Sequence, residues 1–305
     1  MITRFLSFAL LASLALGTPA SADARIAAIH AYGDVVASPA AITAMDDGVL
    51  ARTYPDKRAG LAFEEGRFSS DGAFFAFSVS QIESGDPEQV WLYDLRARNL
   101  VAATEAPKKS AVGFTISALA FGKDDTLYVS GERIDWQDQS NNRTLRVAAT
   151  TAHSAEVKAF PKDADAAFAA QAAAATEDED TITLHGDPFD VIARNRGHGV
   201  FTLSAKNRKT AKIRKIADGG WEFEHVLFDG RAKLRFGDDS GIVTVDLNGG
   251  TSRRLVVAHK RGPGRLLDQT RGGLVAYVMY GSCDPDKYGA VRGGDPQFVC
   301  FVKEP

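Results

Sequence analysis

Short apolar segments that alternate with polar turns dominate the chain, most clearly between residues 66 and 104. Residues 68–72 read Phe-Ser-Ser-Asp-Gly, and an Asp-Gly pair is favoured in tight turns because glycine readily adopts the left-handed conformation. The apolar segment 73–79 that follows has the length of a buried strand. Segments 90–95 and 100–104 predict two further strands. The pattern therefore predicts several antiparallel strands in roughly 40 residues, which is close to the length of one propeller blade.

The same order of strand, acidic turn and strand returns in four later segments, 116–150, 181–204, 221–247 and 273–302. These WD-like, Asp-Gly-containing units resemble the repeats of TolB-like propellers and of the propeller domain in prolyl-oligopeptidase-type peptidases. The resemblance implies an all-β propeller of five to six four-stranded blades, and its TolB-like part favours six. A weaker pattern at 25–52 predicts a partial blade that is completed from the other end of the chain. A propeller is a fold and does not by itself define a function.

One segment departs from the strand pattern. Residues 162–175 are rich in alanine and begin with acidic side chains, which together favour a helix. We therefore predict a short helical insertion near 162–176, followed by an exposed acidic break at 177–180. We interpret the insertion as a helix or mobile segment outside the ring of blades. The alternative is a linker between two domains.

The first 22 residues have the pattern of a secretory signal peptide. Arg4 precedes an apolar run at 5–16, and three small residues place the cleavage site between Ala22 and Asp23. The run is shorter than the roughly 20 residues of a membrane-spanning helix, and a retained signal anchor is the alternative interpretation. We predict a signal peptide at 1–22, a propeller domain at 23–305, and a periplasmic or secreted product.

Charge excludes one class of partner. The chain has 36 basic and 39 acidic side chains, and its net charge is −3. Nucleic-acid binders carry a basic stripe or an excess of basic residues, so we predict no nucleic-acid partner. No second apolar stretch approaches membrane-spanning length, so we predict no membrane span once the signal is removed. The predicted partner is another envelope protein or a peptide, and the pattern leaves the oligomeric state open.

Two cysteines, Cys283 and Cys300, lie near the C-terminus with sixteen residues between them. In an oxidising compartment such a pair predicts a disulfide, which would stabilise the fold by about 3 kcal/mol in the chain-entropy model. A pair of buried free thiols is the alternative. A structural zinc site needs four ligands, so two cysteines alone do not predict one.

Candidate catalytic chemistry is sparse. The chain has no Gly-x-Ser-x-Gly nucleophile elbow, so the resemblance implies the propeller without the hydrolase domain. The densest polar cluster contains two histidines and two carboxylates, which are suited to zinc or acid–base chemistry. Its spacing matches no compact zinc signature, and we interpret it as a solvated set of loops. The cluster consists of His185, Asp187, Asp190, Arg194, Arg196 and His198.

Three further groups of residues are weaker candidates. The carboxylate pairs Asp135/Asp138 and Asp284/Asp286 lack the ligand ladder of an EF-hand, so we predict that they hydrogen-bond their own backbone. Among the tryptophans, we predict Trp91 in the core and treat Trp136 as the surface candidate; Trp221 is the third of this group. The basic cluster of Arg253, Arg254 and residues 259–261 predicts an exposed turn.

These patterns lead to one functional prediction and two alternatives. We predict an exported, non-catalytic propeller that binds a protein, peptide or small ligand, with no cofactor, no metal and no catalytic residue. The first alternative is a metal-dependent propeller hydrolase or lactonase whose site lies at the channel mouth. Such a site takes single residues from several blades, and these are not recognisable from local sequence. The second is a partner subunit for a separate hydrolase.

Overall fold

The computed structural model describes residues 61–81, 88–97, 99–104, 112–135, 137–196, 200–220, 226–238, 241–257, 265–280 and 297–304. These residues form five antiparallel sheets and one α-helix, α4 (Lys162–Ala173). The predicted signal peptide, the cleavage site at Ala22 and Asp23, and the partial blade at 25–52 lie outside this part of the chain. Within it, no helix is long and apolar enough to cross a membrane.

The first two sheets each take four consecutive strands and match the first two predicted units. The first sheet contains β1 (Leu61–Phe68), β2 (Phe74–Gln81), β3 (Gln89–Asp94) and β4 (Asn99–Ala102). The second contains β5 (Val112–Phe121), β6 (Leu127–Asp135), β7 (Arg143–Ala149) and β8 (Ser154–Glu156). A single 3-10 turn, η2 (Gln139–Asn141), joins β6 to β7.

The other three sheets follow in chain order. The third contains β9 (Ala175–Asp178), β10 (Thr181–Leu184), β11 (Phe189–Asn195), β12 (Val200–Asn207) and β13 (Ile213–Gly220). The fourth contains β14 (Val226–Phe228), β15 (Lys233–Asp238), β16 (Gly241–Asp246) and β17 (Ser252–Val257). The fifth has three described strands, β18 (Arg265–Gln269), β19 (Leu274–Tyr280) and β20 (Gln297–Lys303).

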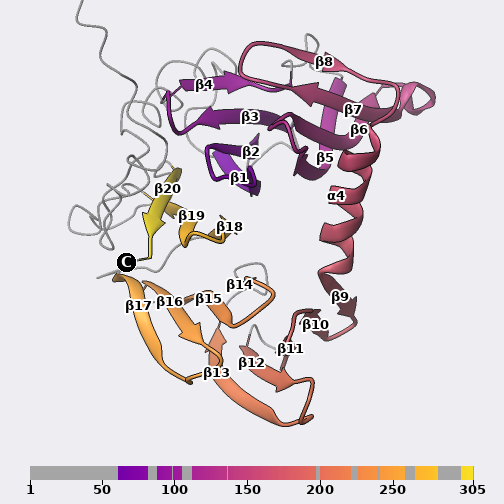
Figure 1. Cartoon of the computed structure of the whole chain (residues 1–305). Helices are drawn as coiled ribbons and strands as arrows, with labels where there is room; N and C mark the ends of the chain where they lie inside the picture. The colour runs from indigo at the N-terminus through magenta and orange to yellow at the C-terminus, as the bar shows by residue number, and fades with distance from the viewer. Residues whose placement is uncertain are drawn as a thin grey trace, which may run out of the picture.

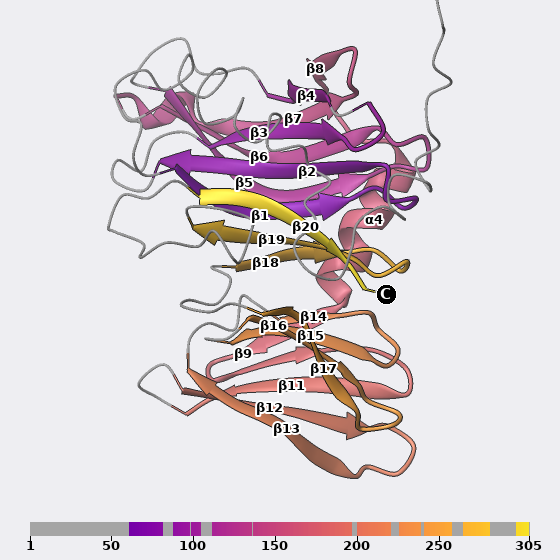
Figure 2. The same ribbon diagram turned by 90° about the vertical axis from the view of Figure 1, so that its left-hand side faces the viewer.

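The five antiparallel sheets follow one another along the chain, as expected for a propeller-like all-β fold (Figure 1). The first strands of three sheets, β5, β1 and β18, are neighbours, and β14 lies beside β18. In the perpendicular view the first, second and fifth sheets form one group, and the third and fourth form another (Figure 2). Helix α4 connects the second sheet to the third.

A similar tight turn joins the first two strands of four sheets. In the first sheet, Gly72 has a φ of 71°, and the Asp71 carboxylate accepts the Ala73 N–H at 2.9 Å. In the fourth sheet, Gly230 has a φ of 75°, and the Asp229 carboxylate accepts the backbone N–H groups of residues 231–233. Glycine adopts these positive φ values without a steric cost. The Asp-Gly turn predicted at 68–72 is therefore confirmed.

Apolar side chains pack between neighbouring sheets. One cluster joins the first sheet to the fifth and includes Phe75, Tyr277 and Phe301, while another joins the first sheet to the second. A third joins the third sheet to the fourth. Trp91 is 2% exposed in the first of these clusters. The prediction that it lies in the core is confirmed.

The alanine-rich helix is confirmed, and the structure shows which strands it contacts. Helix α4 packs against β5 and β9, and the Gln171 side-chain amide donates to the Leu119 carbonyl at 2.9 Å. It therefore lies beside the first strand of the second sheet. The segment 175–178 is not helical or a break, because it forms β9 and pairs with β10. Backbone hydrogen bonds to β10 outweigh the helix preference of Ala175 there.

Candidate functional site

A cavity of about 590 Å³ lies where α4 meets strands of the first two sheets. This volume is within the range of sites that bind small molecules. Its charged lining residues are Glu65, Arg67, Arg146 and Asp165. The neutral polar ones are Ser117, Ser130 and Gln171, and the apolar ones are Ala118, Phe160, Phe168 and Ala172.

Two β-bulges bring polar side chains to this cavity. In β5 the register shifts between Ile116 and Ala118, so Ser117 is an extra residue without a partner on β6. In β1 it shifts between Phe63 and Gly66, so two residues, one of them Glu65, face a single residue of β2. A bulge changes the direction of a side chain and often occurs next to a functional site. Ser117 and Glu65 both line the cavity.

The β5 bulge depends on a glycine in the neighbouring strand. Gly131 of β6 pairs with Ile116 beside the bulge. A Cβ atom at Gly131 would lie 2.2 Å from the carbonyl oxygen of Thr115, far closer than atoms pack. Because that atom belongs to the backbone, no side-chain movement would relieve the overlap. The bulged backbone and the position of Ser117 therefore require glycine at residue 131.

Arg67 is held in the cavity wall by a buried carboxylate of the fifth sheet. Its Nη1 lies 3.6 Å from a carboxylate oxygen of Asp268, and the other oxygen accepts the Phe68 N–H at 2.7 Å. Burial raises the pKa of Asp268, while Arg67 and the backbone N–H groups lower it in part. This pair fixes the orientation of Arg67 and links β1 to β18.

The helix side of the cavity is aromatic. The rings of Phe160 and Phe168 are 5.2 Å apart between centroids, and Tyr128 packs against Phe160 at 5.6 Å. Such tilted and edge-to-face pairs are favourable. Together with the hydrogen bond of Gln171 to β5, they fix α4 as one wall of the cavity.

Several polar groups of the lining are not engaged by the protein. Within the described ranges, the side chains of Ser117, Ser130 and Asp165 have no hydrogen-bond or ion-pair partner. The Arg146 side chain makes one long hydrogen bond, from Nη1 to the Lys158 carbonyl at 3.4 Å. Hydrogen-bond capacity that remains unused on a concave surface is available to a ligand or to water.

The densest polar cluster of the sequence converges only in part. His185 Nδ1 lies 3.5 Å from Asp190, and His185 Nε2 lies 2.7 Å from Thr176 Oγ1. Arg208 Nε is 4.0 Å from the second oxygen of Asp190. Thr176 and Arg208 form no motif with the cluster along the chain, because the pairing of β9 with β10, of β10 with β11 and of β11 with β12 brings them there. These contacts connect the three strands at a half-exposed position.

The other members of that cluster point elsewhere or lie outside the described residues. Arg196 donates to Thr202 at 3.3 Å, and Arg194 is exposed in β11. The Asp187 backbone N–H donates to the Gly230 carbonyl at 2.9 Å, and His198 is not among the described residues. The part of the chain that the structure covers contains no group of three or more His, Cys, Asp or Glu that could hold a metal ion.

The Asp135/Asp138 pair behaves as predicted. The Asp135 carboxylate accepts the N–H groups of Gln137 and Asp138, and these bonds with one from Asn141 lower its pKa. The Asp138 carboxylate accepts the Ser140 N–H and caps the 3-10 turn η2. Asp284, Asp286, Trp136, Trp221 and residues 259–261 lie outside the described residues, so the predictions for them are untested.

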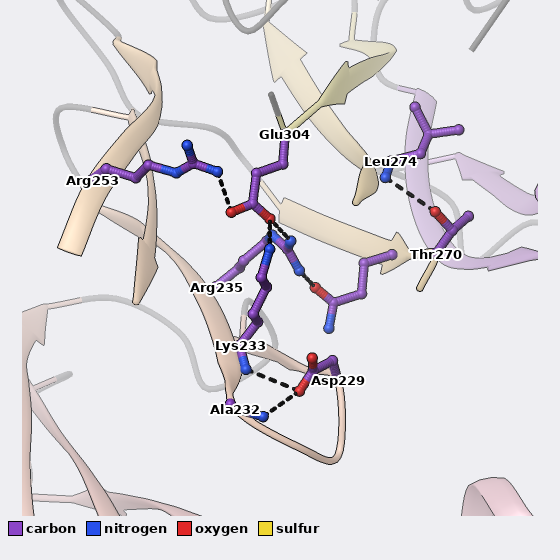
Figure 3. A network of polar contacts seen from close by, with 9 residues as sticks. Asp229, Ala232, Lys233, Arg235, Arg253, Thr270, Leu274 and Glu304 are labelled. Carbon is purple, nitrogen blue, oxygen red and sulfur yellow. Dashed lines mark hydrogen bonds and ion pairs between the residues drawn. The ribbon is translucent and has the colours of Figure 1, made fainter. Parts of the chain in front are cut away.

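A second polar network surrounds Glu304, which follows β20 (Figure 3). Its carboxylate contacts Arg235 and Arg253 and lies 3.1 Å from Lys233 Nζ. Burial raises the pKa of Glu304, but these three cations outweigh it and lower the pKa to about 2. Arg253 and Arg254 are exposed as predicted, but they lie in strand β17 and not in a turn. The network joins the fourth sheet to the fifth.

The comparison with known proteins adds fold neighbours only. No family model matches the sequence, and no curated protein matches it. Among solved structures, the AtxE2 isopeptidase in its apo form is 13% identical over 74% of this chain and 46% of its own, with a TM-score of 0.38. An oligogalacturonate lyase in complex with manganese is 11% identical over 80% and 91%, with a TM-score of 0.41. TolB from Acinetobacter baumannii is 14% identical over 81% and 55%, with a TM-score of 0.27.

This chain spans about half the length of the isopeptidase and of TolB that it matches. Similarity at this level carries no argument about function. The functional argument below therefore depends on the geometry of the chain's own residues.

Proposed function

We propose that this chain is an exported binding protein of the propeller type, and that the cavity beside α4 holds its ligand. The observation that carries the proposal is a cavity of about 590 Å³ whose lining combines an aromatic wall with polar groups that the protein leaves unengaged. The ligand is a small polar molecule or a peptide segment of another envelope protein. For the propeller domain at residues 23–305 we favour six blades; the described residues contribute five sheets, of which the third has five strands. The polar groups of the first two sheets and of α4 make the site.

A metal-dependent hydrolase or lactonase is less well supported. Its site needs a set of metal ligands at the mouth of the channel. The candidate carboxylates and histidines that the structure describes are spread over separate strands and turns, and none of them forms such a set. No observation on the described residues favours this activity over binding.

Filling the cavity is the direct test of the proposal. We expect Ala172→Trp, on the cavity side of α4, to weaken ligand binding at least tenfold because the indole occupies the space. Ala166→Trp places the same side chain at an exposed position of α4 that does not line the cavity. Binding is measured by calorimetry after a thermal-shift screen of amino acids, short peptides, sugars and organic acids. Equal binding by both variants and the wild type would contradict the proposal.

The export part of the proposal has its own test. Cys300 is fully buried in β20, and Cys283 lies outside the described residues, so their disulfide stays a prediction. We expect the secreted protein to begin at Asp23 and to be two hydrogens lighter than the reduced chain by mass spectrometry. Reduction should lower the free energy of unfolding by about 3 kcal/mol. A chain that keeps residues 1–22 or has two alkylatable thiols would contradict these expectations.

A further inference from the structure

Two arginines of the second sheet differ in whether a carboxylate pairs with them. Arg143 of β7 forms an ion pair with Glu156 of β8, with 2.9 Å between Nη2 and Oε2. Arg146 of the same strand lines the cavity, and no carboxylate among the described residues pairs with it. Arg67, the other cavity arginine, is paired with Asp268. Arg146 is therefore the cavity cation whose charge the described residues do not neutralise.

We infer that the ligand of the cavity carries a carboxylate, and that Arg146 is the residue that anchors it. This inference rests on the proposed function and specifies the chemical class of its ligand. A guanidinium has five N–H donors in a planar arrangement, and it binds a carboxylate through two parallel, charge-assisted hydrogen bonds. The single bond from Arg146 to the Lys158 carbonyl, at 3.4 Å, leaves most of these donors for a ligand.

The other lining residues indicate which groups the ligand carries besides its carboxylate. Asp165 lies in the first turn of α4, where the helix dipole stabilises its negative charge. Its carboxylate accepts hydrogen bonds, and so does the free Oε1 of Gln171, whose Nε2 is used by the Leu119 carbonyl. These groups select amine, amide or hydroxyl donors. Phe160 and Phe168 supply an apolar surface beside them.

Two kinds of molecule have this chemistry in common: a short peptide with a free C-terminus and a sugar acid. Each combines one carboxylate with several N–H or O–H donors. Asp268 already neutralises Arg67, so the other charged groups of the lining are Arg146 and the acidic residues Glu65 and Asp165. A carboxylate of the ligand pairs with Arg146, and the N–H or O–H donors of the same ligand reach the acidic residues.

The test uses the full chain and two matched pairs of probes in titration calorimetry. The pairs are trialanine with trialanine amide, and lactobionic acid with lactose. We expect the acid of at least one pair to bind, and its uncharged counterpart to bind at least tenfold more weakly. Arg146→Gln should weaken binding of that acid by roughly 10- to 100-fold, since a hydrogen bond to a charged group is lost. Arg143→Gln, on the same strand and outside the cavity, should bind like the wild type.

Each outcome decides between the two proposals. The inference is overturned if an acid binds tightly and the Arg146→Gln variant binds it equally well. It is also overturned if the two members of each pair bind equally, or if no probe binds. The proposed function fails separately, when Ala172→Trp does not affect any ligand found in the wider screen. A preference for trialanine identifies a peptide site, and a preference for lactobionic acid identifies a sugar-acid site.

Discussion

The Glu304→Gln variant is expected to lose about 3–5 kcal/mol of unfolding free energy, because it breaks a buried ion pair on one side only. The Glu304 side chain is 5% exposed and that of Arg235 is 2% exposed. Glutamine has the same shape as glutamate but no charge, so Arg235 stays buried without an anion. Gln269 continues to accept a hydrogen bond from Arg235, but a neutral amide does not offset the charge.

Urea unfolding at neutral pH measures this effect, and an exposed ion pair provides the control. Glu156→Gln removes the partner of Arg143, and both side chains of that pair are about half exposed. Exposed pairs contribute up to about 1 kcal/mol, so this variant should be nearly as stable as the wild type. Similar losses in the two variants would show that Glu304 does not neutralise a buried charge.

The pH dependence gives a second measure of the same interaction. The pKa of Glu304 falls from an ordinary 4.5 to about 2 in the folded chain. A lowered carboxyl pKa means that the folded state favours the ionised form, so its stabilisation is complete above pH 4.5. That stabilisation is lost as the pH falls from 4.5 toward 2. The difference in unfolding free energy between wild type and Glu304→Gln should shrink over this interval, and a constant difference would contradict the assignment.

Local sequence signals predicted local structure well. The Asp71-Gly72 turn and the flanking strands follow from turn chemistry and apolar runs, and Trp91 lies in the core as its strand pattern indicated. The helix of residues 162–173 follows from alanine propensity. The packing of the helix does not follow from the sequence, because small alanine side chains do not indicate which surface they contact. Two larger residues of this helix, Phe168 and Gln171, hold it against the second sheet, and neither formed a recognisable motif.

The candidate site could not be predicted from the sequence, because its residues are spread over several elements. Its residues come from β1, β5, β6, β7, the loop before α4 and α4 itself, so Glu65 and Asp165 lie far apart along the chain. The side chain of Ser117 reaches the cavity through a bulge, and the signal for that bulge is Gly131 in the next strand. The contiguous cluster at 185–198 was conspicuous in the sequence, yet β-strand geometry separates most of its members. Proximity in sequence was a poor guide to proximity in space.

Phe75→Ala should lower the free energy of unfolding by about 3–5 kcal/mol, the range for removing a buried aromatic ring. Phe75 has no exposed surface, and its ring centroid lies 4.7 Å from that of Phe68 and 5.2 Å from that of Phe301. Gly66 approaches so closely that a Cβ atom there would lie 2.7 Å from the Phe75 ring. The surroundings therefore cannot collapse easily into the space that the ring leaves.

The neighbouring residue offers a matched control. Phe74 lies on the opposite face of β2 and is only partly buried, so Phe74→Ala should cost clearly less than Phe75→Ala in the same urea titration. Phe75 joins the first sheet to the fifth and does not line the cavity. In conditions where the Phe75→Ala variant is still folded, we therefore expect ligand affinity within a few-fold of the wild type. Equal destabilisation by the two variants would mean that the packing of Phe75 between these sheets contributes no more than the packing of the partly buried Phe74 ring.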